Sequence, residues 1–191
     1  MTEDRNSDVL AQLGTFSPEQ LQLLANHVHC RTVPKGAVLL SEGAICQTMY
    51  YGLEGAFYQV SDHDEQEPAI IDLHGPGQWF FNHHSFVTQT PSAYTLLAYT
   101  DGTVLELTIQ VMHDLIAVSP VFLQLASLLN QATDRIRFFD GNLTPLQKYQ
   151  YILDYRPQLM QAFPLKMIAA YLKVAPETLS RVRERLARGI S

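Results

Sequence analysis

Short apolar runs separated by glycine and proline turns fill the chain from about residue 32 to residue 107. Runs of this length between turn residues are typical of β-strands. The turns include Pro34-Lys35-Gly36 and Gly75-Pro76-Gly77. Strands are predicted at 38–40, 49–53, 56–60, 69–73, 78–81, 94–99 and 103–107. This spacing predicts a β-roll or jelly roll of two packed sheets.

Helical patterns stand on both sides of this region. Ser17 with Gln20 forms a capping-box sequence, which predicts a first helix that reaches His27 and His29. A second amphipathic helix is predicted over 109–118.

Apolar residues then recur at intervals of three and four over 119–141, which predicts a heptad seam on one long helix. The seam residues are Phe122, Leu125, Leu129, Ala132, Ile136 and Phe139. Such a seam packs either on a second copy of the chain or on the chain's own roll. We expect the first, and hence a homodimer.

The last stretch, 163–188, is predicted to form two helices joined by a tight turn. Ile168 and Leu172 face inward on the first helix, and Pro176 begins the second, where Leu179 and Leu186 face inward. The remaining face of the second helix is basic. Its arginines can pair with guanine and its glutamate can accept from cytosine, so it is a candidate DNA-reading face. The candidate contacts are Glu177, Thr178, Ser180, Arg181, Arg185 and Arg188, with Lys166 and Lys173 beside them. The alternative is a helical hairpin with a solvated basic face.

The charge is unevenly distributed along the 191 residues. Residues 141–191 hold 8 Lys or Arg against 3 Asp or Glu, a net of +5, whereas residues 1–140 hold 5 against 16, a net of -11. A basic segment on an acidic body is expected where only one end meets phosphate. Together with the candidate DNA-reading face, this charge division predicts double-stranded DNA as the partner.

The composition of the chain also limits the classes of protein to which it can belong. The chain has no apolar run long enough to span a membrane, and its first residues are acidic and polar, so a globular, soluble and cytoplasmic protein without membrane contact is expected. Cys30 and Cys46 lack metal-site spacing and are expected as free, buried thiols. No catalytic constellation is visible, so no enzyme activity, cofactor or metal is expected.

The C-terminal motif Ile168-Ala169-Ala170-Tyr171-Leu172 followed by Pro176-Glu177-Thr178-Leu179-Ser180-Arg181 resembles the helix-turn-helix of the Crp/Fnr family of transcription regulators. The resemblance implies that Glu177 and Arg181 read base edges. Pro176 stands where the family has a further Arg, and Lys173 stands at its usual turn Gly.

The glycine turns at Gly36, Gly43, Gly55 and Gly77 are similar to those of a cyclic-nucleotide-binding β-roll. The resemblance therefore implies an α+β fold with a sensor roll at 1–118, a dimerisation helix at 119–141 and an all-α helix-turn-helix domain at 142–191. The chain ends at Ser191, shortly after the second helix, so a full wing is not expected.

The family's nucleotide-binding residues are replaced in this sequence. Phe81-Asn82 stands where the family has a ribose-binding Gly-Glu pair, and Ser92-Ala93 stands where it has a phosphate-binding Arg-Ser pair. Losing two charge-assisted contacts weakens binding by about 3–6 kcal/mol. We therefore expect no response to cyclic AMP and a degenerate pocket, in which His83 and His84 also lie. The roll then senses another small molecule or senses none.

The histidines suggest one alternative of a different class, a cupin-like metal-binding jelly roll or enzyme with an accessory helical domain. Cupins hold metal through His-x-His followed shortly by Glu. His27-x-His29 fits the first part, but Val33 and Pro34 stand where the Glu is required.

Overall fold

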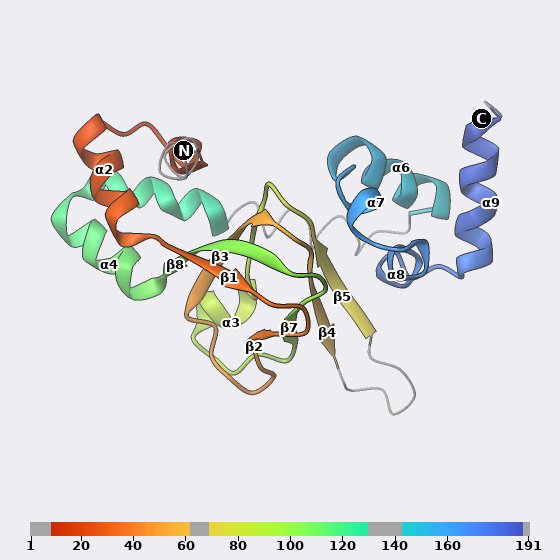
Figure 1. Cartoon of the computed structure of the whole chain (residues 1–191), viewed down its shortest axis with the longest axis horizontal. Helices are drawn as coiled ribbons and strands as arrows, with labels where there is room; N and C mark the ends of the chain where they lie inside the picture. The colour runs from red at the N-terminus through yellow and green to blue at the C-terminus, as the bar shows by residue number, and fades with distance from the viewer. Residues whose placement is uncertain (1–8, 62–68, 130–142, 189–191) are drawn as a thin grey trace.

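Two antiparallel sheets form the centre of the protein (Figure 1). The computed structural model describes residues 9–61, 69–129 and 143–188. The first sheet has the order β1-β8-β3-β6, with β1 His29–Val33, β8 Gly102–Thr108, β3 Thr48–Glu54 and β6 Trp79–Phe80. The second has the order β2-β7-β4-β5, with β2 Val38–Leu40, β7 Thr95–Ala98, β4 Phe57–Ser61 and β5 Ala69–His74. The predicted α+β fold with a β-roll is therefore confirmed.

Glycine is required where two turns of the roll meet. Gly55 has φ +87°, and a Cβ there would lie 2.6 Å from the Cα of Gly102 and 2.7 Å from the carbonyl oxygen of Asp101. No other residue fits this contact without backbone movement. The turn before β4 and the turn before β8 are thus held against each other.

Helices cover one end of the roll (Figure 1). They are α2 Pro18–His27, α4 Ile109–Val118 and the 3-10 helix η1 Pro120–Ala126. The predicted capping box is present, because the Ser17 hydroxyl accepts from Gln20 N and the Gln20 side chain accepts from Ser17 N. The predicted helix at 109–118 has the bounds of α4.

The beginning of the predicted dimerisation helix has a different structure. Residues 120–126 form η1, and Phe122 and Leu125 are fully buried in the core of the protomer. The Phe122 ring stacks on Phe16 at 5.6 Å between centroids. These two side chains therefore fill the chain's own core and are not free to face a second copy. Leu129 is half-buried against the same core, and Ala132, Ile136 and Phe139 lie outside the described residues.

Two elements beside the roll were not predicted. His29 and Cys30 belong to β1, which pairs with β8, and not to the preceding helix. Cys30 is exposed rather than buried, whereas Cys46 is buried as expected; both are free thiols. The helix α3, His83–Thr88, occupies the segment assigned to the nucleotide pocket.

Four helices form a second core at the C-terminal end. They are α6 Pro145–Tyr155, α7 Leu159–Ala162, α8 Leu165–Tyr171 and α9 Pro176–Ala187. Ile168, Leu172 and Leu179 are fully buried there, together with Leu73 of β5. β5 is the edge of its sheet, so the helices cover a strand edge that water or another chain would otherwise meet.

Candidate nucleic-acid interface

The turn between α8 and α9 gives the two helices their relative position. The last turn of α8 is closed by hydrogen bonds from Lys173 N to Ala170 O (3.1 Å) and from Val174 N to Ala169 O (3.0 Å). Lys173 has φ 53°, a left-handed conformation that glycine adopts most easily. Pro176 then occupies the first turn of α9, where its missing N–H costs nothing.

Both helices bury the faces predicted from the sequence. Leu179 is fully buried, and Val182 and Leu186 pack partly buried against the same core. The Lys148 ammonium of α6 donates to Leu172 O at 2.9 Å, where it also offsets the negative end of α8. α9 is therefore supported from α6 and α8 and has its opposite face open to solvent.

The open face carries the charged residues singled out in the sequence. Glu177, Arg181 and Arg185 are exposed, and they recur every four residues along one side of α9. Thr178 is half-buried beside them. Figure 1 shows that α9 lies at the end of the molecule opposite α2 and α4.

The other candidate contacts lie around that face. Lys166 on α8 and Lys173 in the turn are both exposed. Arg188 is exposed and lies 3.9 Å from Glu184, a loose ion pair between its Nη2 and Oε2. Ser180 is placed differently: it is half-buried and lines a hollow between α9 and α6, together with Tyr149 and Arg183. The structure thus brings every predicted contact into the α8–α9 unit, with Ser180 turned toward α6.

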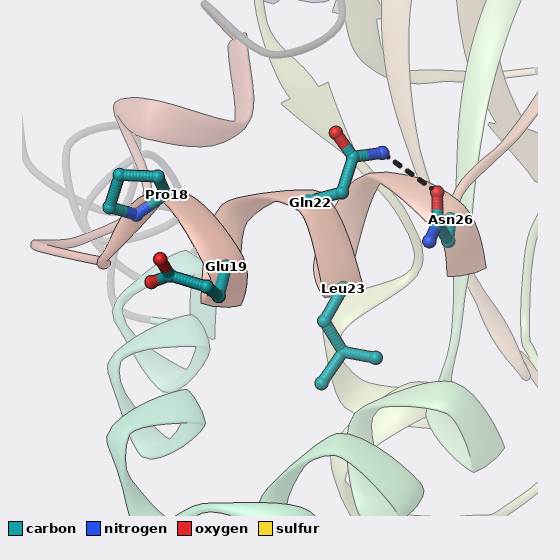
Figure 2. Close-up of a pocket in the computed structure, with 5 residues that line it drawn as sticks. All are labelled: Pro18, Glu19, Gln22, Leu23 and Asn26. Carbon is teal, nitrogen blue, oxygen red and sulfur yellow. Dashed lines mark hydrogen bonds between the residues drawn. The ribbon is translucent and has the colours of Figure 1, made fainter.

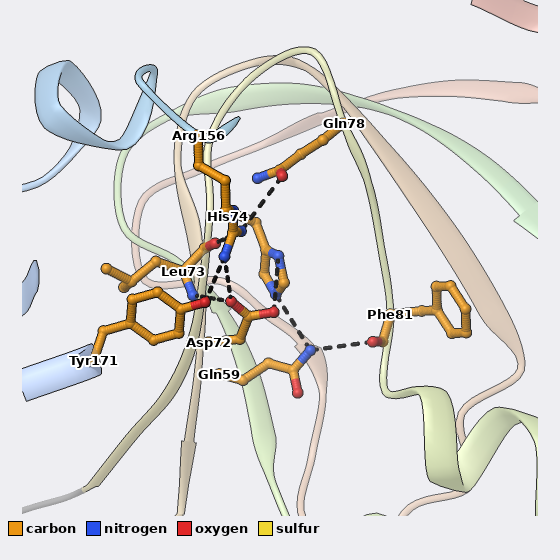
Figure 3. A network of polar contacts seen from close by, with 8 residues as sticks. All are labelled: Gln59, Asp72, Leu73, His74, Gln78, Phe81, Arg156 and Tyr171. Atoms are coloured by element: carbon orange, nitrogen blue, oxygen red, sulfur yellow. Dashed lines mark hydrogen bonds and ion pairs between the residues drawn. The ribbon is translucent and has the colours of Figure 1, made fainter. Parts of the chain in front are cut away.

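The four helices α6 to α9 are called the helical unit below. A buried arginine joins this helical unit to the roll (Figure 3). Arg156, the residue after α6, is 3% exposed. Its Nη1 donates to Asp72 Oδ1 at 3.0 Å and to the Tyr171 hydroxyl at 2.6 Å, and its Nη2 donates to Leu73 O. Burial by itself would lower the pKa of Arg156, but the Asp72 carboxylate raises it, and the net shift is upward. The guanidinium is therefore charged and held between β5 and α8, a contact that the sequence analysis did not identify.

The residues at the family's nucleotide-binding positions contact each other. Asn82 and Ser92 are both buried, and Asn82 Nδ2 donates to Ser92 Oγ at 2.8 Å. The Asn82 side-chain oxygen, Oδ1, accepts from Ser85 N and caps α3, while Ser92 Oγ donates to Tyr94 O. Their polar groups are therefore used within the protein.

The neighbours of Asn82 differ in exposure. Phe81 is buried against Phe86, with ring centroids 5.2 Å apart. His83 is half-buried, and His84 and Ala93 are exposed. The structure brings Phe81, Asn82 and Ser92 together and leaves His84 and Ala93 at the surface.

The histidines of the cupin-like alternative lie on separate elements. His27 ends α2, where its Nδ1 lies 2.8 Å from Leu23 O, and His29 is on β1. Among the residues that the structure describes, no three His, Cys, Asp or Glu side chains are grouped so that they could hold a metal.

A surface hollow runs along α2 (Figure 2). It is lined by Pro18, Glu19, Gln22, Leu23 and Asn26, and Gln22 Nε2 donates to Asn26 Oδ1 at 2.9 Å. The hydrogen bond from Ser17 lowers the pKa of Glu19, the one charged residue of the lining. The hollow shares no residue with the α9 face or with the nucleotide-binding positions.

Comparison with known protein families shows which type of domain the roll resembles. Residues 30–119 match the family model of the cyclic nucleotide-binding domain. The roll is therefore similar to domains of the cyclic nucleotide-binding type. No curated protein sequence matches the chain. In the described part of the chain, no helix has the length and apolar character needed to cross a membrane.

Solved structures extend the likeness to nearly the whole chain. FixK2 from Bradyrhizobium japonicum is 17% identical, with a TM-score of 0.65 over 85% of each chain. The Catabolite Activator Protein of Thermus thermophilus is 22% identical, with a TM-score of 0.51 over 95% of this chain and 87% of that one. The regulator CLP of Xanthomonas campestris is 16% identical, with a TM-score of 0.56 over 91% and 93%.

These similarities establish the fold, and with the family match they confirm the resemblance to Crp/Fnr-type regulators that the sequence predicts.

Proposed function

We propose that the protein is a cytoplasmic, homodimeric transcription regulator that binds double-stranded DNA through α9 and does not respond to cyclic AMP. The observation that carries the proposal is the exposed face of α9, on which Glu177, Arg181 and Arg185 stand on one side of a helix anchored by buried Leu179. A helix of this kind fits the major groove, and its side chains match the groups that read bases there.

The position of each charged residue along α9 indicates whether it contacts bases or phosphates. Glu177 and Arg181 stand in its first turns, which enter the groove most deeply in helix-turn-helix complexes. Arg185 and Arg188 lie further along, where contact with the phosphate backbone is expected, and Lys166 and Lys173 add charge from α8 and the turn. The proposal assigns no catalytic step to the chain.

The test is selection of bound fragments from a pool of random duplex DNA by the full chain. A two-fold symmetric dimer should enrich an inverted repeat whose half-site centres are about 34 Å apart. The double variant Glu177→Ala, Arg181→Ala should lose the enrichment. Its matched control, Arg31→Ala, removes an arginine from β1 on the roll and should retain it. Enrichment of no sequence by the wild-type chain would refute the proposal.

A further inference from the structure

The buried arginine belongs to a longer chain of polar contacts that crosses the roll (Figure 3). We name it the Arg156 network, and it consists of Phe81, Gln59, His74, Asp72, Arg156 and Tyr171. At one end is the backbone of Phe81, next to the buried pair Asn82 and Ser92. At the other end is the Tyr171 hydroxyl, on the last residue of α8.

The first half of the network lies inside the roll. Gln59 is 6% exposed, and its Nε2 donates to Phe81 O at 3.2 Å and lies 3.3 Å from His74 Nε2. His74 is fully buried, and its ring stacks on Phe80 at 4.9 Å between centroids and an interplanar angle of 14°. The ring therefore has little freedom to move independently of its neighbours.

The second half leads out of the roll. His74 Nδ1 lies 3.7 Å from Asp72 Oδ2, which is too long for a hydrogen bond and makes this contact electrostatic. In the tautomer with the proton on Nδ1, His74 Nε2 can accept from Gln59 Nε2. The other Asp72 oxygen accepts from Arg156, which also donates to Tyr171.

The side chains in this network are buried, except that of Asp72, which is 19% exposed, so each is strongly affected by the placement of the next. A charged group in a low-dielectric interior interacts more strongly with its neighbours, and leaving one of them unpaired is costly. Gln59 and Asp72 are also cross-strand partners in β4 and β5, which fixes their separation through the backbone. A shift of the Phe81 backbone therefore changes the hydrogen bonding of Gln59 and, through His74 and Asp72, that of Arg156.

We infer that the Arg156 network couples the segment at Phe81 and Asn82 to the position of α8, so that a change in the roll interior alters how firmly the helical unit is held on β5. The inference rests on the proposed function in one respect only: because α8 supports α9, a change in the position of α8 would affect DNA binding. The coupling itself involves contacts within one chain and can be measured without DNA.

Native-state amide hydrogen exchange of the full chain, measured by mass spectrometry, reports on this coupling through the peptides that contain β5 and α8. Gln59→Met removes the amide and approximately keeps the volume, and Gln59 makes no contact with α8 in the network. We expect several-fold faster exchange in α8 as well as in β5. Tyr171→Phe should do the same, and the double variant should exchange no faster than the more affected single variant.

Two matched variants separate coupling from general destabilisation. Tyr155→Phe removes a hydroxyl from a residue of the same helical unit that is 72% exposed, and exchange should stay as in the wild type. Leu105→Ala weakens the roll in β8, outside the network, and exchange in α8 should stay unchanged under conditions where the chain is folded.

Three results would overturn the inference. One is a Gln59→Met effect confined to β4 and β5, another is additive effects in the double variant, and the third is an equal rise in α8 exchange in Leu105→Ala. If Gln59→Met does not fold, Asp72→Asn serves instead: faster exchange in both α8 and residues 79–83 supports coupling, and a change in α8 alone contradicts it.

DNA titrations of the same variants distinguish this inference from the proposed function. If coupling reaches α9, Gln59→Met should change the dissociation constant for the selected duplex, while Tyr155→Phe should not. A wild-type chain that binds no duplex would refute the proposed function, and the exchange measurements would still decide the coupling.

Discussion

The position of Arg156 shows how one residue can connect the roll to the C-terminal helices. Its guanidinium is almost completely buried, yet it has a carboxylate, a hydroxyl and a carbonyl as hydrogen-bond acceptors. Arg suits such a site because its planar group donates in several directions at once. Removing it would leave the Asp72 carboxylate without its cationic partner.

We predict that Arg156→Met lowers the free energy of unfolding by about 2–3 kcal/mol, less than the roughly 3–5 kcal/mol of a fully buried pair because the Asp72 side chain is 19% exposed. Arg31→Met is the matched control. It removes the Arg31–Glu106 ion pair at 2.7 Å, in which the Arg31 side chain is 46% exposed, and should cost under about 1 kcal/mol. Urea denaturation measures both, and equal losses would show that Arg156 does not hold the units together.

Lys173 combines an unfavourable backbone conformation with a charge near the proposed DNA face. Because φ is 53°, Lys173→Gly should relieve left-handed strain and raise the free energy of unfolding by about 0.5–1 kcal/mol. It should also weaken DNA binding by the loss of one phosphate contact.

Gln89 provides the comparison for Lys173, since it has the same φ of 53° but its side chain donates to Phe86 O at 2.6 Å. Gln89→Gly should therefore gain less stability than Lys173→Gly. Urea denaturation and DNA titration of the two variants check this, and a loss of stability in Lys173→Gly would contradict the account.

At the scale of elements, the strands and the α8–α9 unit could be predicted because their patterns are local. Glycine turns separate the strands, and Pro164 and Pro176 mark where α8 and α9 begin. β1 was missed because most of it is exposed and it follows α2 directly, so its residues show no alternation. The Arg156 network was missed because Asp72 and Arg156 are 84 residues apart and no sequence spacing links them.

The heptad pattern over 119–141 illustrates how periodicity can have two origins. Its first residues are spaced as in a coiled coil, but Phe122 and Leu125 are buried in the protomer. An apolar residue every three or four positions fits any buried helical face, whether the partner is the same chain or another. The assembly prediction therefore rests on the later part of the seam.

We predict that Leu129→Glu converts a dimer into a monomer, because it would place two like charges across an apolar interface. Phe122→Ala should instead lower stability by about 3–5 kcal/mol and leave the dimer intact. Sedimentation velocity and urea denaturation separate the two effects. A wild-type chain that is monomeric at tens of micromolar would show that the seam is not an interface.

For the whole molecule, the arrangement is an acidic roll that carries a small basic helical unit at one end (Figure 1). The charge division predicted from the sequence coincides with this spatial division, since residues 143–188 form the second core. A polyanion would thus be attracted to one end of the molecule and repelled by the rest.

The roll keeps the cyclic nucleotide-binding fold while Asn82 and Ser92 hydrogen-bond to each other at its nucleotide positions. We predict that neither cyclic AMP nor cyclic GMP binds at micromolar concentration, because the charged partners of ribose and phosphate are absent and about 3–6 kcal/mol of binding energy is lost with them. Titration calorimetry is the measurement. Micromolar affinity for either nucleotide would contradict the prediction and point to a replacement anion site.

The central claim, that α9 reads DNA, is tested most directly by titrating Arg181→Ala and Arg188→Ala against single-base variants of the selected duplex at several salt concentrations. Arg181→Ala should cost roughly 1–3 kcal/mol and remove the preference at one base pair of each half-site. Arg188→Ala should weaken all duplexes alike and reduce the salt slope by about one per half-site. If Arg181→Ala weakens every duplex equally and leaves base preference unchanged, α9 is only a phosphate-binding surface and the claim is wrong.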